Sequence, residues 1–240
     1  MHTARAEPTQ AVAPAEDEPS PPVAEAKDPG PPEPSACRLR LTEDVAIVRS
    51  LPPITGPGEC SAPDVVSLEA VVLKDGKRVT IMPHVTLRCE MAEGVIHWMR
   101  DDIAPAIGEL GGAAQELITA DSFDCRGRNR VAGGKLSEHG RANALDVRGF
   151  TLVNGKAIDL TDMGVARDFR ERVRLSTCSR FTTVLGPGSD GYHEDHVHLD
   201  LAARRGGYRM CQWDVRTAPE VANVPLPPEK PREPANDGKL

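Results

Sequence analysis

The chain has 240 residues, a formal net charge of −7 and 22 prolines. The ends differ from the middle: residues 1–36 carry nine prolines and a net charge of −5, and residues 217–240 carry six prolines and a charge of −1. Such segments bury too little apolar surface to offset chain entropy, so we expect a disordered Pro/Ala/Glu-rich spacer and a disordered tail around one domain at 37–216. The domain itself carries −1, which argues against a nucleic-acid binder, and no stretch approaches the ~20 apolar residues of a membrane-spanning helix.

The first half of the domain combines β-rich runs with one long helix. Residues 38–50 predict a short helix followed by a strand, and residues 65–89 predict a hairpin with an Asp-Gly turn. Apolar residues recur at helical spacing over 91–110, where we expect Pro105 to bend the helix or to mark a second short turn. A further strand is expected over 116–123.

The second half continues the same alternation of elements. It predicts a strand at 142–147, a hairpin joining 149–153 to 157–160, a helix at 165–175 and a second hairpin over 181–202. The expected fold class is therefore α+β: a single domain with a central antiparallel sheet flanked by helices.

Six cysteines lie within the domain, and neither tail contains one. Their dispersal, without a CxxC motif, predicts three disulfides in an oxidising compartment, although six reduced thiols are the alternative. Proximity along the chain favours the pairs Cys37–Cys60, Cys89–Cys125 and Cys178–Cys211. The first ten residues have no apolar signal-peptide core. Either a leader has been removed, or translation starts elsewhere, or the inference of export is wrong.

The segment 195–201 reads DHVHLDL, and three of the seven histidines lie between positions 193 and 198. In a strand, side chains alternate between two faces. One face would then carry Val197, Leu199 and Leu201 into the core, and the other would carry His196, His198 and Asp200. A polar surface strand is the plain alternative, and His193 is expected to be a surface loop residue.

A second histidine, His139, precedes Asp146 by seven residues at the approach to another strand. If His198 lies on a neighbouring strand, the chain brings two imidazoles and one carboxylate to one point. That set suits Zn²⁺ with an open fourth position for water. An open position suits hydrolysis, because the metal lowers the pKa of bound water from ~16 towards ~7. Taken singly, each of these residues could be an ordinary surface or loop residue.

The stretches SEHGRANALDV and DHVHLDL together resemble the bacterial extensin-like C-terminal domain, over most of residues 37–212. That group is similar to the LAS zinc peptidases: lysostaphin, D-Ala-D-Ala metallopeptidases and hedgehog. The shared pattern is S-x-H-x6-D with a later HxH. The resemblance implies a LAS/hedgehog-like architecture in which His139, Asp146 and His198 bind zinc. It also implies hydrolysis of peptide bonds in peptidoglycan stem peptides or cross-links by a periplasmic or secreted protein.

The resemblance also implies roles around the metal. In D-Ala-D-Ala peptidases an acidic residue three positions before the last ligand is the general base, and Asp195 stands there, where those enzymes commonly use Glu. Glu194 is the rival base, because strand alternation would put it on the face of His196 and His198. His196 suits a group that holds the attacking water or the developing oxyanion.

Substrate contacts are expected upstream of the first ligand. The resemblance implies that Arg126 or Arg128 holds a substrate carboxylate or carbonyl, for which the planar guanidinium is suited. A solvated basic turn is the alternative. Ser137 matches the first position of S-x-H and is expected to bond substrate or to orient the loop.

Two functions therefore compete at this point: a zinc peptidase, and a non-catalytic zinc-containing module that binds the cell envelope, as hedgehog suggests by resemblance. The acidic residues at 194 and 195 favour the enzyme, because a structural zinc needs no base. An iron oxygenase fits poorly, since its carboxylate usually stands two residues from the first histidine. We expect the protein to act as a monomer.

Overall fold

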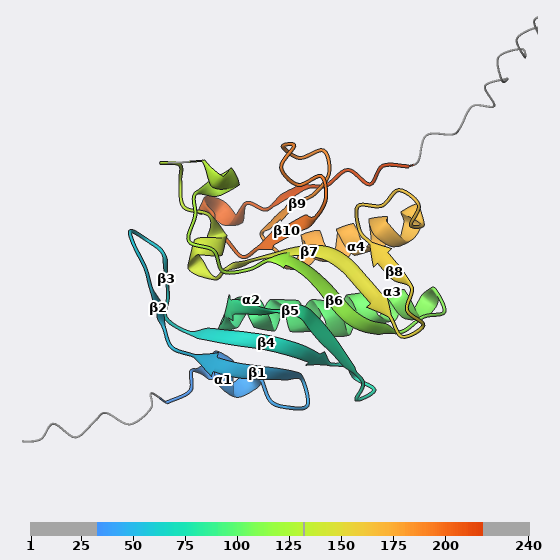
Figure 1. The fold of residues 1–240 in the computed structure, drawn as a ribbon, viewed down its shortest axis with the longest axis horizontal. Helices are drawn as coiled ribbons and strands as arrows, with labels where there is room; N and C mark the ends of the chain where they lie inside the picture. Colours follow the sequence, from blue (N-terminus) through green and yellow to red (C-terminus); the bar gives the residue numbers. More distant parts are fainter. Residues whose placement is uncertain (1–32, 132, 218–240) are drawn as a thin grey trace, which may run out of the picture. The chain divides into compact units, whose positions relative to one another are not determined.

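In a computed structural model, residues 33–131 and 133–217 form one mixed nine-stranded sheet and a small two-stranded sheet, with a few helices (Figure 1). The remaining residues, which include nearly all of the two expected tails, lie outside the described part of the chain. The spatial order of the large sheet is β1 (Ala46–Leu51), β4 (Val65–Val72), β5 (Arg78–Arg88), β6 (Ala114–Asp121), β7 (Ala144–Leu152), β10 (Val197–Asp200), β9 (Thr183–Leu185) and β11 (Met210–Gln212), with β8 (Ala157–Asp159) beside β7.

The α+β class is confirmed, but the expectation of a wholly antiparallel sheet is wrong. Strand β5 pairs with β6 in parallel, and so does β9 with β11. Parallel neighbours need a long crossover, and the helical segment between β5 and β6 supplies one. The small sheet, β2 (Ile54–Thr55) with β3 (Ser61–Ala62), was not expected either.

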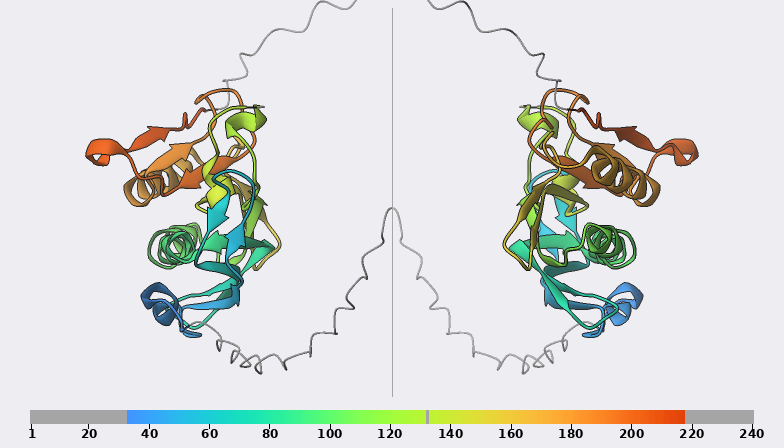
Figure 2. Two further views of the ribbon diagram at one scale, coloured as in Figure 1. Left: turned by 90° about the vertical axis from the view of Figure 1, so that its left-hand side faces the viewer. Right: turned by 90° about the vertical axis from the view of Figure 1, so that its right-hand side faces the viewer.

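The helices are α1 (Ala36–Arg40), α2 (Cys89–Trp98), a π-helical turn (Met99–Ile103), α3 (Ala104–Glu109) and α4 (Arg167–Arg180). The expected irregularity near Pro105 is the π turn, which ends just before the first turn of α3, where a proline is tolerated. The two views of Figure 2 place the green helices and the amber α4 on the same face of the sheet.

The core lies between that face and the helices. Val197 and Leu199 of β10 are buried there, as are Leu145 and Val147 of β7. Because side chains alternate along a strand, the intervening residues of β7 and β10 point to the opposite face, away from the helices. The histidines and carboxylates of the candidate functional site lie on that opposite face.

Three disulfides are present, but two of the expected pairings are wrong. The structure joins Cys37 to Cys89 and Cys60 to Cys125, and it confirms Cys178–Cys211. Distance along the chain was misleading because the β4–β5 hairpin returns the chain to its starting point, which places the start of α2 against α1.

We expect a Cys60→Ser/Cys125→Ser variant to show faster hydrogen exchange across residues 122–141. The unfolding free energy should also fall by about 2–4 kcal/mol, because this bond ties the β2–β3 hairpin to that loop and closes a sequence separation of 65 residues. The matched control is Cys178→Ser/Cys211→Ser, which should lose comparable stability without affecting exchange in the loop. Equal acceleration in both variants would contradict a local role.

Candidate metal centre

Two of the three proposed ligands meet through strand pairing. In the antiparallel pair of β7 and β10, Asp146 lies directly opposite His198, on the face away from the helices. The third, His139, arrives from a 3₁₀ turn, Glu138–Arg141, that directly precedes β7. Ser137 caps this turn by accepting a hydrogen bond from the His139 backbone N–H, at 3.4 Å.

The three side chains present their donor atoms to one another and are all buried. His139 Nε2 lies 3.1 Å from His198 Nδ1 and 3.2 Å from Asp146 Oδ1, and the last two atoms are 2.9 Å apart. Two ligands held about 2.05 Å from zinc at the tetrahedral angle are about 3.3 Å apart. The spacing therefore fits one face of a tetrahedral zinc site.

The hydrogen bonds made by the second ring nitrogen of each imidazole also fit metal binding. His139 Nδ1 faces the Ser122 carbonyl, which only accepts, so Nδ1 carries the proton and Nε2 is free to bind a cation. His198 Nε2 lies 3.1 Å from Asp200 Oδ2, which leaves Nδ1 facing inwards. Metal-binding histidines typically donate their second ring nitrogen in this way. Asp200 was not among the residues predicted for the site, although its place two residues after His198 on the same strand face was a usable signal.

Electrostatics couple these groups when no cation is present. Burial alone would raise the pKa of Asp146, but the adjoining imidazoles of His139 and His198 outweigh it and hold that pKa well below its ordinary value. Burial alone would lower the pKa of His198, but Asp146 and Asp200 raise it to about 9. The same pocket therefore suits a proton on His198 or a cation in its place.

His196 and Asp195 stand beside the three ligands. His196 Nδ1 lies 2.8 Å from Asp195 Oδ1, and its Nε2 lies 3.6 Å from Asp146 Oδ2. Asp195 itself is 66% exposed and also pairs with Arg148, at 3.3 Å. Glu194 points elsewhere, accepting a hydrogen bond from the Gly188 N–H at 2.8 Å and lying 3.2 Å from Arg216.

The two arginines proposed for substrate binding differ in their surroundings. Arg126 directs Nε to Asp124 and Nη2 to Asp121, each at 3.0 Å, and Nη2 also lies 4.0 Å from Asp146. Arg128 is exposed, and within the described residues it pairs with no carboxylate. The charge of Arg126 is thus paired with carboxylates of the loop and lies near Asp146, whereas the charge of Arg128 is not paired with a described carboxylate.

Apart from Glu194, the residues predicted from sequence for the site all border a cavity of about 500 Å³, a size typical of small-ligand sites. His193 lies in a loop, as expected, but it also lines the cavity and is only 7% exposed, so the expectation that it lies at the surface is wrong. Its Nδ1 lies 2.7 Å from Asp190, and its ring packs 5.1 Å from that of His196. The crowding of histidines between 193 and 198 was the signal for this placement.

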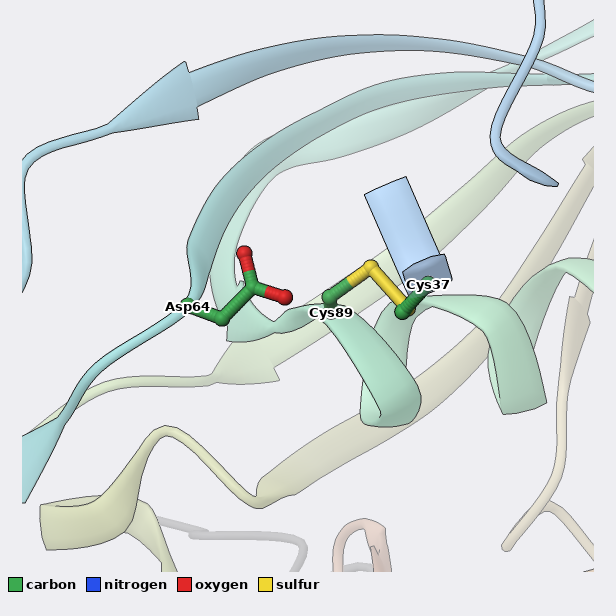
Figure 3. A group of neighbouring side chains, drawn as sticks. All are labelled: Cys37, Asp64 and Cys89. Carbon is green, nitrogen blue, oxygen red and sulfur yellow. A yellow bond between two sulfur atoms is a disulfide. The ribbon is translucent and has the colours of Figure 1, made fainter. Parts of the chain in front are cut away.

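A second cluster of potential ligands, Cys37, Asp64 and Cys89, has a different explanation (Figure 3). Its two sulfurs are joined in a disulfide, so neither is a thiolate that could bind a metal. Asp64 instead accepts a hydrogen bond from Ser35 Oγ, at 2.6 Å. Of the two clusters in the described residues, only the histidine–aspartate group can act as a metal site.

The model of a family described as "Extensin-like protein C-terminus" matches residues 35–212. The chain belongs to this family. No curated protein and no solved structure matches it significantly. Within residues 33–131 and 133–217, none of the helices combines the length and apolar character needed to cross a membrane.

We expect the wild-type domain to bind one zinc ion per chain. Replacing His139, Asp146 or His198 by alanine should abolish tight binding, and Asp200→Asn should weaken it about 10- to 100-fold, because Asp200 orients a ligand from outside. Titration with a competing chelator measures each affinity. The control is His84→Ala, which removes an exposed histidine. Retention of wild-type affinity by the three ligand variants would rule out this site.

In chelator-treated protein, we expect the free energy of unfolding to fall by roughly 3 kcal/mol as the pH rises from 6.5 to 9. The pKa of His198 is raised from 6.5 to about 9 by folding, so its proton stabilises the fold fully below 6.5 and is lost through pH 9. Burial lowers the pKa of His193, which therefore titrates below this window. Urea denaturation measures the slope, which His198→Asn should flatten. A wild-type stability that rises over this range would contradict the assignment.

Proposed function

We propose that this extensin-like domain is a zinc-dependent peptidase that hydrolyses peptide bonds in peptidoglycan stem peptides or cross-links. The observation that carries the proposal is the set of three donor atoms on His139, Asp146 and His198, spaced 2.9–3.2 Å apart at a cavity of about 500 Å³. The similarity of the two motifs to LAS zinc peptidases, including D-Ala-D-Ala metallopeptidases, supports the substrate class.

Zinc bound by these residues would polarise an amide carbonyl and acidify water. Beside it, His196 Nδ1 donates to Asp195, so Nε2 is the basic nitrogen that faces the cavity. We assign to this Nε2 the removal of a proton from the attacking water and its delivery to the leaving amine. Asp195 then orients the imidazole and stabilises its charged form, as the acidic member of a catalytic triad does.

This assignment changes two roles suggested by the motif alone. Asp195 acts through His196 rather than as the base itself, because its Oδ1 already accepts the imidazole proton. Glu194 is held by Gly188 and Arg216 and does not border the cavity, so it has no part in the reaction. Arg128 remains available for a substrate carbonyl.

The cysteines support the proposed location in the cell envelope. All six cysteines are paired in disulfides, which is consistent with an oxidising extracellular environment. A hydrolase of the bacterial cell wall would work in such an environment, in the periplasm or elsewhere in the envelope.

The test is to incubate zinc-loaded protein with purified sacculi and to identify the released fragments by mass spectrometry. We expect new amine and carboxylate ends from peptide hydrolysis. His196→Ala should lower kcat by about 10²–10⁴-fold while zinc affinity is retained, because it removes proton transfer but no ligand. Glu194→Gln is the matched comparison and should keep kcat within a few-fold.

Two outcomes would count against this assignment. Full activity in His196→Ala, with activity lost in Glu194→Gln, would move the base to Glu194. If the zinc-loaded wild type hydrolyses no muropeptide, yet still sediments with sacculi, the domain is a non-catalytic envelope-binding module.

A further inference from the structure

The cavity extends from the metal centre across β9 and β11. Strand pairing places Leu185 directly opposite His198, and Thr183 directly opposite Asp200. On the far side of β9, Met210 of β11 pairs with Thr183. Directly paired residues share a face of the sheet, so Leu185 and Met210 face the same way as His198 and Asp200. Both border the cavity, and they form an apolar strip beside the metal ligands.

A cationic side chain, Arg204, also borders the cavity, and it comes from the segment after β10. It is half-buried, and its Nη1 donates to the Thr182 carbonyl at 3.0 Å. Within the described part of the chain, no carboxylate lies within 4.0 Å of its guanidinium. The nearby Asp200 is already engaged by His198 and by the Ala202 N–H.

The other lining arginines differ from Arg204. Arg126 and Arg130 both pair with Asp121 and Asp124, while Arg148 pairs with Asp195. Arg128 is exposed and lies in the loop that follows β6. Arg204 is therefore the half-buried lining guanidinium whose charge no described carboxylate balances.

We propose that Arg204, Leu185 and Met210 form a subsite for a carboxylate on the leaving-group side of the substrate, next to a small apolar side chain. This proposal rests on the proposed peptidase function. The guanidinium fork matches a carboxylate, and the two apolar side chains match a methyl group. Arg204 is thus a specificity-determining residue that binds substrate without touching the scissile bond.

The spacing of the sheet sets where the carboxylate lies. Arg204 is bonded to the carbonyl of Thr182, which adjoins Thr183 in β9. Thr183 lies one strand across from His198 and two residues further along, so the two residues are about 8 Å apart at ordinary strand spacings. An extended peptide covers about 7 Å in two residues. The carboxylate therefore lies one or two residues from the cleaved amide. Two sources share this chemistry: the terminal carboxylate of a stem peptide, and the free carboxylate beside the amine in a cross-link.

The experiment compares each source with its amide. Zinc-loaded full-length protein is assayed on acetyl-D-Ala-D-Ala and its carboxamide, and on cross-linked dimer muropeptides with the cross-link carboxylate free or amidated. We expect the wild type to prefer the free carboxylate in at least one pair. R204Q should reduce that preference about 10- to 100-fold, because a charge-assisted contact is lost. R205Q is the matched control, since Arg205 is exposed and does not border the cavity.

A second readout separates this subsite from the peptidase reaction. NMR titration of chelator-treated protein with the dipeptide and its carboxamide measures binding where hydrolysis cannot proceed. A carboxylate preference that R204Q abolishes supports the subsite, even if the zinc-loaded wild type hydrolyses nothing and the peptidase proposal fails. Hydrolysis with no carboxylate preference, or with a preference that R204Q retains, overturns the subsite and leaves the peptidase proposal standing.

Discussion

Asp146 and His198 face each other across the antiparallel strands β7 and β10, so backbone hydrogen bonds set the separation of their side chains. A slip of the pairing by one residue would bring Asp146 towards the core and Leu145 towards the cavity. The buried Leu145, Val147, Val197 and Leu199 oppose that slip, because each would lose its apolar contacts. The packing of the core therefore enforces the geometry of the site on the other face.

The third proposed ligand, His139, is held in place differently. His139 lies in a short 3₁₀ turn, which has little stability of its own. Ser137 caps it, the Ser122 carbonyl holds its imidazole, and the Cys60–Cys125 disulfide ties the neighbouring loop to the β2–β3 hairpin. Hydrogen bonds and one disulfide thus fix the position of His139, whereas the register of the sheet fixes the positions of the other two proposed ligands.

The two faces of the large sheet also differ in the kind of side chain that they bury. Helices α2, α3 and α4 cover one face of the sheet, where the main hydrophobic core of the described residues is buried (Figure 2). The opposite face carries the buried histidines and carboxylates, whose charges compensate one another. This division would let the loop after β6 and the apolar residues of β9 and β11 make the proposed substrate contacts without disturbing the core.

Local periodicity determined much of this protein from sequence alone. Strand alternation indicated the faces of β10 and the candidate ligand His198, and the resemblance to a family with an S-x-H-x6-D pattern indicated His139 and Asp146. What only the tertiary structure decided concerns pairing between distant segments: the parallel β5–β6 and β9–β11 ladders, the Cys37–Cys89 and Cys60–Cys125 bonds, and the burial of His193. Periodicity reports which side of its own element a residue occupies, but not which element lies beside it. The contrasting surroundings of Glu194, Asp195 and Arg126 depend on such neighbours, so only the folded chain could distinguish them.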